Sequence, residues 1–249
     1  MSREAGSAFG GKAFVLAAGL GTRLRPLTES QPKVMVEVAG KKILERTITQ
    51  LKNAGVTELV INTHYFPEAV TSYFGDGSDF GVNIEYSHEP EILGTAGGLK
   101  KVEHHFKNNE EFLVVYGDNL FDLDFSKFIK QTLGKDEVGS LLLFDRTKSA
   151  NSGIAGGVVE IDEQNNVVGF YEAQHKPEIN YVNGGIYKLT PEVLNYIPAK
   201  TFYDFGKHVF PEMLNNLKKL KGYVIEPHEA LFGIDNLESL EKANKYFKQ

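Results

Sequence analysis

A group of small and cationic residues near the start of the chain has the composition of a site for phosphate groups. The stretch FVLAAGLGTRLRPLTESQPK runs from residue 14 to residue 33. Gly19 and Gly21 remove side-chain bulk where an apolar run ends, so backbone N–H groups there are open to an anion. Arg23 and Lys33 add two cations to the same stretch. Amide groups beside two positive charges predict a loop that binds a triphosphate.

Two better-known phosphate motifs do not account for this stretch. The dinucleotide-binding fingerprint G-x-G-x-x-G fails because Leu24 stands where the third glycine is required. Residues 6–12 nearly spell a P-loop, but Ala13 replaces the Ser or Thr that would hold magnesium, and the motif precedes the first apolar run. A glycine-rich turn with a solvated basic rim remains the purely structural alternative.

A carboxylate follows the clearest buried strand of the chain. The apolar run FLVVY at 112–116 is followed directly by Gly117, Asp118 and Asn119. Open α/β sheets bind ligands at the carboxyl ends of their strands, and carboxylate oxygens suit magnesium. Asp118 is therefore the first candidate for a metal ligand, although an aspartate in this position can instead cap the following turn.

The elements that must position these residues alternate between strand and helix in the first half of the chain. Short apolar runs predict strands at 14–16, 58–62, 82–86 and 112–116. Beyond residue 125, the pattern predicts strands at 140–144 and 181–189, and a hairpin at 156–162 and 167–171. It then predicts a helical segment at 205–220, a strand at 222–226 and a last helix. We therefore predict an α/β fold with a Rossmann-like, mixed but mostly parallel sheet, flanking helices and antiparallel additions in the second half.

Composition limits the class of protein. The 249 residues are 41% hydrophobic and 24% charged, which is ordinary for a globular α/β chain. The formal net charge of −6 argues against binding to nucleic acid or to an anionic membrane. The absence of cysteine excludes disulfides, thiolate catalysis and zinc–thiolate sites.

The same composition predicts a cytoplasmic, single-domain protein. No apolar run approaches the ~20 residues that a membrane helix needs, and the N-terminus lacks a secretory signal. Residues 1–11 are polar and rich in glycine and serine, and we expect them to form a flexible leader. Residues 12–249 are expected to form one domain.

The pattern A-A-G-x-G-T-R-L-x-P-L-T, followed by P-K, resembles the nucleotidyltransferases that make nucleoside diphosphate sugars from a sugar 1-phosphate and a nucleoside triphosphate. The resemblance extends from residue 12 to the last helix and implies a glycosyltransferase-A-like fold. Its match implies that Arg23 contacts the leaving pyrophosphate and Lys33 the reacting phosphates. It also implies a nucleotide-binding role for Leu16, Ala17, Ala18, Gly19, Gly21 and Thr22. The nucleotide-binding half would be about 12–125, and the sugar-phosphate-binding half 126–249.

The segment LGTAGGL at 93–99 resembles the family segment that touches the nucleobase, which implies such a role for Gly94, Thr95 and Ala96. A close helix contact with an N-cap explains the same residues structurally. Family members with this segment are often guanylyltransferases, and the motifs of this chain are most similar to those of members that act on mannose 1-phosphate. GTP with mannose 1-phosphate is therefore the first expected substrate pair. Transfer of a cytidylyl, uridylyl or thymidylyl group, to glucose 1-phosphate or to a non-sugar acceptor such as phosphocholine, stays open.

Two further motifs of the family have counterparts in the second half. V-N-x-G-I-Y is matched at 182–187, which implies that Asn183 binds sugar hydroxyls. E-K-P is matched incompletely, because three residues separate Glu172 from Lys176. The resemblance implies that Glu172 binds hydroxyls and that Lys176 contacts the sugar phosphate, with Gly157 in the same subsite. Without the resemblance, Glu172 and Lys176 would be read as an ordinary exposed pair of charged residues.

The family also implies a magnesium cofactor held by two carboxylates, here Asp118 and Asp235. Asp235 departs from the family pattern, since it stands two residues after the usual position. Its local sequence also offers a structural explanation, because Glu238 three residues later suggests a capping box. These departures leave a second hypothesis, a homologue that senses nucleotide sugars without turnover. A homo-oligomer is possible, and the oligomeric state stays open.

Overall fold

The computed structural model describes residues 10–153 and 156–248 of the chain. Within these residues, a nine-stranded sheet has the path β11-β10-β12-β6-β1-β4-β5, and β8 lies between β12 and β13. The first-half strands of this sheet are β1 (Lys12–Leu16), β4 (Glu58–Thr63), β5 (Asn83–His88) and β6 (Phe112–Tyr116). These four strands run parallel to one another in the order β6-β1-β4-β5. The carboxyl ends of β1 and β6 therefore lie side by side at the same end of the sheet.

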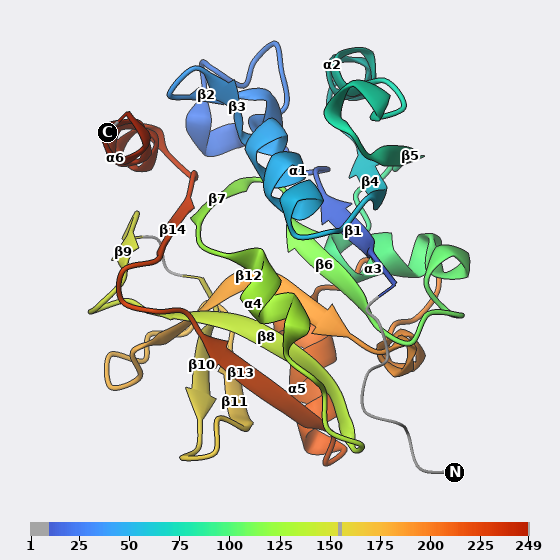
Figure 1. Cartoon of the computed structure of the whole chain (residues 1–249), viewed down its shortest axis with the longest axis vertical. Coiled ribbons are helices and arrows are strands. Elements are labelled where there is room, and N and C mark those ends of the chain that lie inside the picture. Colours follow the sequence, from blue (N-terminus) through green and yellow to red (C-terminus); the bar gives the residue numbers. More distant parts are fainter. Residues whose placement is uncertain (1–9, 154–155, 249) are drawn as a thin grey trace.

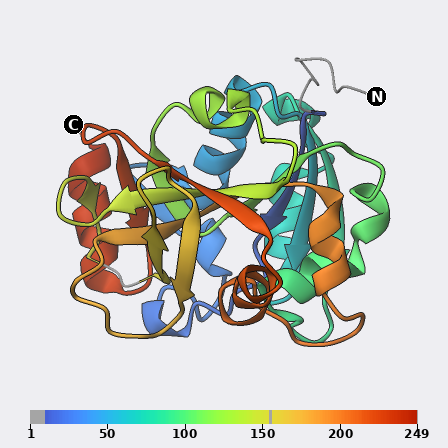
Figure 2. The ribbon, with the colours of Figure 1, turned by 90° about the horizontal axis from the view of Figure 1, so that it is seen from below.

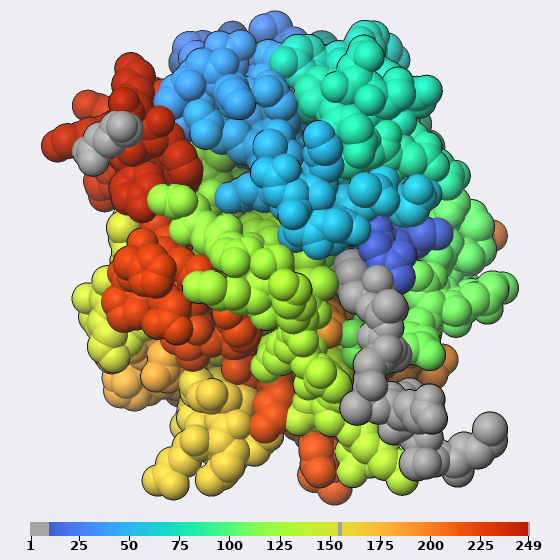
Figure 3. All heavy atoms as spheres, in the orientation of Figure 1, coloured from blue at the N-terminus to red at the C-terminus, as the bar shows by residue number. Residues whose placement is uncertain are grey.

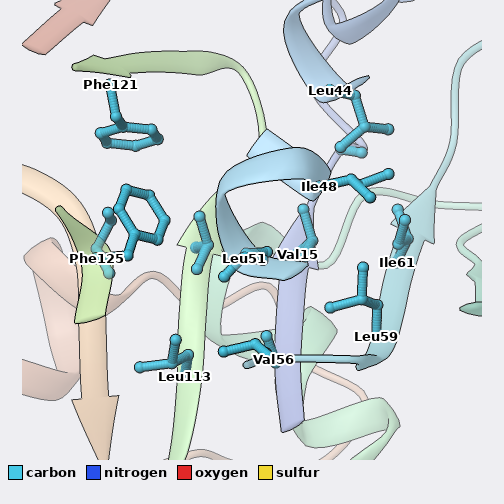
Figure 4. Packing of buried hydrophobic residues seen from close by; sticks show 14 of the residues in the cluster. Val15, Leu44, Ile48, Leu51, Val56, Leu59, Ile61, Leu113, Phe121 and Phe125 are labelled. Carbon is cyan, nitrogen blue, oxygen red and sulfur yellow. The ribbon is translucent and has the colours of Figure 1, made fainter. Parts of the chain in front are cut away.

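Three helices flank the parallel strands: α1 (Ile43–Asn53), α2 (Pro67–Phe74) and α3 (Gly94–Lys101). In α1 the apolar positions Leu44, Ile48 and Leu51 are spaced by four and three residues, so they lie on one helix face. Figure 4 shows this face packed against β1, where Val15 is fully buried. Fully burying each such side chain contributes roughly 1.5–3 kcal/mol, which fixes the helix over the sheet.

The second half adds antiparallel strands to this core. Its strands in the main sheet are β8 (Glu137–Asp145), β10 (Val158–Ile161), β11 (Val167–Tyr171), β12 (Tyr181–Leu189) and β13 (Lys219–Val224). Strand β12 joins the halves, because it runs antiparallel to β6, β8 and β10. Figure 2 shows the blue-to-green strands of the first half on one side and the yellow strands β10 and β11 on the other. The predicted fold class, including the antiparallel additions, is confirmed.

The helical segment predicted at 205–220 is shorter, and its first turn is π-helical. A π-helical turn spans Phe205–Val209, the helix α5 spans Phe210–Asn215, and β13 begins at Lys219. Pro211, near the start of α5, lacks the N–H that a continuous helix requires. Leu217 has φ 58°, a left-handed conformation that ends the helix. These two local features, and not the apolar pattern, set the boundaries.

Smaller elements place the last helix against an early segment of the chain. A three-stranded sheet contains β7 (Asn119–Asp122), β14 (Ala230–Gly233) and β9 (Ala150–Asn151), and β2 (Glu37–Val38) pairs with β3 (Lys41–Lys42). The helix α4 (Phe125–Lys130) follows β7, and α6 (Leu237–Phe247) follows β14. Asn244 of α6 accepts a hydrogen bond from the backbone N–H of Ala39, at 2.9 Å. Figure 1 shows α6 beside β2 and β3, and Figure 3 shows the red C-terminal helix against the blue early segment.

Among the described residues, no helix combines the length and the apolar composition that crossing a membrane requires.

Candidate active site

Lys33, Asp118 and Asp235 meet in space although they are far apart in the chain. The Nζ atom of Lys33 lies 2.8 Å from Oδ2 of Asp118 and 2.7 Å from Oδ1 of Asp235. The side chain of Lys33 is 7% exposed, and those of Asp118 and Asp235 are 30% and 19% exposed. Burial alone would lower the pKa of Lys33, but the two carboxylates and their hydrogen bonds raise it above its ordinary value. Lys33 is therefore held as an ammonium ion.

The loop after β1 fixes Lys33 through a close backbone approach. Pro32 holds the chain extended and Lys33 opens a short 3₁₀ turn, Lys33–Met35. Gly21, with φ 60°, packs so closely that a Cβ there would lie 2.8 Å from Cβ of Lys33. Thr28 donates a hydrogen bond from Oγ1 to the carbonyl of Gly21 at 2.8 Å. Only glycine fits this turn, which is why the small residues of the loop matter structurally.

Asp235 is not the cap of α6, which corrects the structural explanation offered from the sequence. Asn236 is the N-cap, and its Oδ1 accepts from the backbone N–H of Ser239 at 2.8 Å. Ser239 completes the capping box by accepting from the N–H of Asn236 at 3.0 Å. Glu238 has no part in this box. The Asp235 carboxylate is therefore free to meet Lys33.

Arg23 reaches the same carboxylate from the loop. One of its terminal nitrogens, Nη2, lies 3.3 Å from Oδ1 of Asp235, while its side chain is 71% exposed. An exposed ion pair of this kind contributes little to stability. The guanidinium group is thus available to a ligand in a way that the buried Lys33 is not.

Two cavities adjoin the Lys33–Asp118–Asp235 cluster. The first, which we call the carboxylate cavity, has a volume of about 330 Å³, and its lining includes Arg23, Asn119, Gly157, Glu172, Asn183, Lys207 and Asp235. The second, which we call the loop cavity, has a volume of about 240 Å³, and its lining includes Leu16, Ala17, Ala18, Gly19, Lys33, Asn62, Glu89, Ile92, Gly94 and Phe202. Both are lined by Thr95, Tyr116, Asp118 and Asp204. The cluster therefore stands where the two cavities meet.

Most residues predicted to bind ligands line one of these cavities, but four do not. Gly21 and Thr22 support the turn before Lys33, and Ala96 is buried in α3. Lys176 points to another surface, since its Nζ lies 4.8 Å from the centre of the Tyr171 ring. The structure does not bring Lys176 together with the other predicted sugar-phosphate residues.

The start of α3 is held by a segment that the sequence analysis did not single out. Asp204 accepts hydrogen bonds on Oδ1 from the backbone N–H of Thr95 at 3.0 Å and from its hydroxyl at 3.2 Å. The carbonyl of Tyr203 accepts from the N–H groups of Ala96 and Gly97, at 2.9 and 3.0 Å. Three backbone N–H groups of the first turn of α3 are therefore already satisfied by the second half. No local pattern in the sequence signals this long-range pairing.

Asn62 and Glu89, which the sequence analysis also did not single out, are hydrogen-bonded to each other and to the loop after β1. Oδ1 of Asn62 accepts from the backbone N–H of Ala17 at 2.7 Å, and its Nδ2 donates to Glu89 at 2.8 Å. The other carboxylate oxygen of Glu89 accepts from the N–H of Leu93 at 3.0 Å. Glu89 is fully buried. Their position could have identified these two residues in the sequence, since both are polar and stand where the apolar runs of β4 and β5 end.

Glu172 is seated between two glycines in the carboxylate cavity. A Cβ at Gly157 or at Gly206 would lie 2.5 Å from its Oε2 atom. Burial raises the pKa of Glu172 above its ordinary value, Lys207 opposes this shift, and Asp204 adds to it. The absence of side chains at the two glycines thus gives the carboxylate room beside the cavity.

Buried side chains also join the two cavities. Nδ2 of Asn183 donates to the hydroxyl of Tyr187 at 2.7 Å, and that hydroxyl donates to the hydroxyl of Tyr116 at 3.3 Å. Tyr116 lines both cavities, and burial raises the pKa of its hydroxyl well above the ordinary value. Asn183 is therefore oriented by a neutral hydrogen-bonded chain that ends at the loop cavity.

In this mixed α/β fold, two adjoining cavities meet at a cationic loop after β1 and at two carboxylates, Asp118 after β6 and Asp235 after β14. This arrangement suits the binding of phosphate compounds. The profile of the nucleotidyl transferase family matches residues 12–247. The chain belongs to this family.

Relatives in the family differ in their named substrates. The chain is 35% identical over 222 residues to a UTP–glucose-1-phosphate uridylyltransferase of Synechocystis, covering 82% of this chain and 55% of the relative. It is 34% identical to a mannose-1-phosphate guanylyltransferase of Mycobacterium tuberculosis, covering 85% and 58%. It is also 34% identical to a D-glycero-alpha-D-manno-heptose 1-phosphate guanylyltransferase of Campylobacter jejuni, covering 84% and 88%. The chain thus spans little more than half the length of the first two relatives.

A solved structure supports the fold. The crystal structure of HddC from Yersinia pseudotuberculosis superimposes with a TM-score of 0.77 at 25% sequence identity, covering 95% of this chain and 99% of that one.

Proposed function

We propose that this chain catalyses nucleotidyl transfer from a nucleoside triphosphate to a sugar 1-phosphate, giving a nucleoside diphosphate sugar and pyrophosphate. The observation that carries the proposal is the meeting of Lys33, Asp118 and Asp235 at the junction of two cavities. One cavity would hold the triphosphate and base, and the other the acceptor. The family membership and the named activities of the relatives agree with this reaction.

The nucleotide would occupy the loop cavity. Its phosphates would face the residues Ala17 to Gly19 and the two cations Arg23 and Lys33. The base would lie toward Ile92 and Gly94. The acceptor would occupy the carboxylate cavity, where Glu172 and Asn183 offer oxygen and nitrogen atoms to sugar hydroxyls.

The reaction would proceed by direct displacement at the α-phosphorus. A phosphate oxygen of the acceptor forms the new bond while the bond from the α-phosphorus to the bridging oxygen of the β-phosphate breaks, and pyrophosphate leaves without a covalent intermediate. Arg23 would stabilise charge on the leaving pyrophosphate, and Lys33 would do so on the α-phosphate. Such preorganised charge acts most strongly in a site shielded from water.

The residues present fit a magnesium ion. Two carboxylates, Asp118 and Asp235, converge on one cationic atom, Nζ of Lys33. Mg²⁺ is commonly held by one or two carboxylates together with substrate phosphates, so these two residues would be its protein ligands. When bound, the ion would neutralise the repulsion between the two phosphate groups that react. The rest of the positive charge comes from Arg23 and Lys33.

The first substrate pair to test is GTP with mannose 1-phosphate, because two relatives are named guanylyltransferases. The uridylyltransferase relative keeps UTP with glucose 1-phosphate as the alternative. The test is product analysis by anion-exchange chromatography and mass spectrometry, with GTP, CTP, UTP, dTTP and ATP each combined with mannose, glucose and heptose 1-phosphates. A nucleoside diphosphate sugar from one pair supports the proposal and names both substrates. Nucleotide binding without product from any pair would contradict it and favour a sensing role or a non-sugar acceptor.

A further inference from the structure

We propose that Lys207 is the lysine that binds the phosphate group of the acceptor, in place of the sequence-predicted Lys176. This inference rests on the proposed function, since it assigns a residue to the acceptor subsite. It depends on where the structure places the two lysines, on the charge of the carboxylate cavity and on the anchoring of the segment that carries Lys207.

Lys176 does not face the acceptor. It follows the end of β11, and its Nζ lies over the ring of Tyr171, 4.8 Å from the ring centre. Its carbonyl accepts a hydrogen bond from Arg146 at 3.0 Å. The cation–π contact and the anchored backbone together direct this lysine away from the cavity that holds Glu172. Three residues separate Glu172 from Lys176, so the lysine does not follow the glutamate directly as it does in E-K-P.

Binding of a phosphate at the Glu172 end of the carboxylate cavity requires a cation there. It is lined by four carboxylates, namely Asp118, Glu172, Asp204 and Asp235. The ion pairs found at this cavity among the described residues involve Arg23 and Lys33, and both act at the Asp235 end. A phosphate dianion entering beside Glu172 would be repelled unless another cation faced it. Lys207 lines this cavity and is close enough to oppose the rise in the pKa of Glu172.

The backbone around Lys207 is firmly placed although the side chain is exposed. Lys207 lies in the π-helical turn between the buried residues Phe205 and Val209. Phe205 packs edge-on against Tyr187 with ring centres 5.3 Å apart, and its N–H donates to Thr95 Oγ1 at 2.9 Å. Gly206 leaves the space that the Glu172 carboxylate fills. Lys207 therefore combines a fixed backbone with an exposed side chain, which suits capture of a phosphate.

The kinetic test compares four variants, at three lysines, with the wild-type chain. Lys207→Ala is expected to raise KM for the sugar 1-phosphate by about 10- to 100-fold, the range for losing a hydrogen bond to a charged group, with KM for the nucleotide changed by less than about threefold. Lys207→Arg should recover most of the loss, because it restores the charge. Lys127→Ala, on the exposed face of α4, removes the same net charge away from the cavities and is the matched control. A large rise in acceptor KM for Lys176→Ala, with Lys207→Ala unaffected, would overturn the inference.

A binding measurement separates this inference from the proposed function. Mannose 1-phosphate and unphosphorylated mannose are each titrated by calorimetry into the wild-type, Lys207→Ala and Lys127→Ala chains. We expect wild type and Lys127→Ala to prefer the phosphate, and Lys207→Ala to lose about tenfold or more of that preference. If Lys207→Ala prefers mannose 1-phosphate over mannose as strongly as wild type does, the assignment is refuted even if turnover is present. Intact, Lys207-dependent binding without turnover supports the assignment and counts against the catalytic proposal alone.

Discussion

At Lys33, one buried ammonium group balances two carboxylates that would otherwise repel each other. The sequence showed each of the three residues in a suggestive local setting: a cationic loop, the end of a buried strand and the approach to the last helix. It did not show that they touch. Asp235 lies 202 residues from Lys33 along the chain, and no local pattern encodes such a contact.

Replacing Lys33 should affect catalysis much more than folding. We expect Lys33→Ala to lower kcat by about 10² to 10³, the range for removing one preorganised charge from an active site. Steady-state kinetics with saturating substrates measures this loss, and circular dichroism checks that the variant is folded. Asp118→Ala should behave in the same way. A kcat near the wild-type value for either variant would contradict the catalytic role proposed for that residue.

The charge of Lys33 also predicts a pH dependence of stability. Because the pKa of Lys33 is raised in the folded chain, its contribution to the free energy of unfolding is fully present below the ordinary value of 10.5. It is lost as the pH rises through the higher pKa of the folded state. The difference in Tm between wild type and Lys33→Met should thus be constant from pH 7 to about 10 and decrease above it. A difference that grows with pH above 10 would show that the sign of the shift is wrong.

At the level of the elements, the apolar patterns predicted the strands of the main sheet well. Strands in the sheet bury apolar side chains in short regular runs, and such runs are visible in the sequence. The patterns failed where polar groups decide the boundary. Asn236 and Ser239, and not Asp235 with Glu238, cap α6. The boundaries of the helical segment at 205–220 followed from Pro211 and Leu217, whose effects are conformational.

The two neighbours Asp235 and Asn236 should therefore separate stability from activity. Asn236→Ala removes a capping side chain and should lower the free energy of unfolding by about 1 kcal/mol. Asp235→Ala should leave the cap intact and instead lower kcat by about 10² or more. Urea unfolding and kinetics of both variants test this. The assignment fails if Asp235→Ala loses the stability of a helix cap while keeping its activity.

The segment beside α3 offers a direct reporter of nucleotide binding. Phe202 is 54% exposed at the loop cavity, and the adjoining residue Tyr203 is fixed by backbone hydrogen bonds to α3. The chain contains no tryptophan, so Phe202→Trp introduces a single tryptophan, which can be excited selectively over the tyrosines. We expect the base to stack on this ring, so fluorescence should change in a saturable way as the triphosphate is added.

The matched control is Leu217→Trp, since Leu217 is 90% exposed at a different surface. Its fluorescence should not respond to the nucleotide. Equal responses from the two variants, or no response from Phe202→Trp while calorimetry detects binding, would place the base away from Phe202.

At the scale of the whole molecule, the two halves do not form two separate sites. Phe202 and Asp204, from the second half, line the loop cavity that the sequence assigned to the first half. The class of fold could be predicted, and most of the residues that the motifs singled out line one of the two cavities. Their roles in binding stay predictions. Contributions from the segment around Asp204 and the position of Lys207 could not be predicted, since they depend on how β12 brings the halves together.

The fate of each phosphate tests the central claim most directly. The purified chain is incubated with Mg²⁺, a sugar 1-phosphate and a nucleoside triphosphate labelled with ³²P at either the α- or the γ-position, using the substrate pair that gives product. The account predicts that the α-label enters the nucleoside diphosphate sugar and the γ-label leaves as pyrophosphate, in equal amounts and only when both substrates are present. Release of the γ-label as inorganic phosphate, or of the α-label as nucleoside monophosphate, would contradict it.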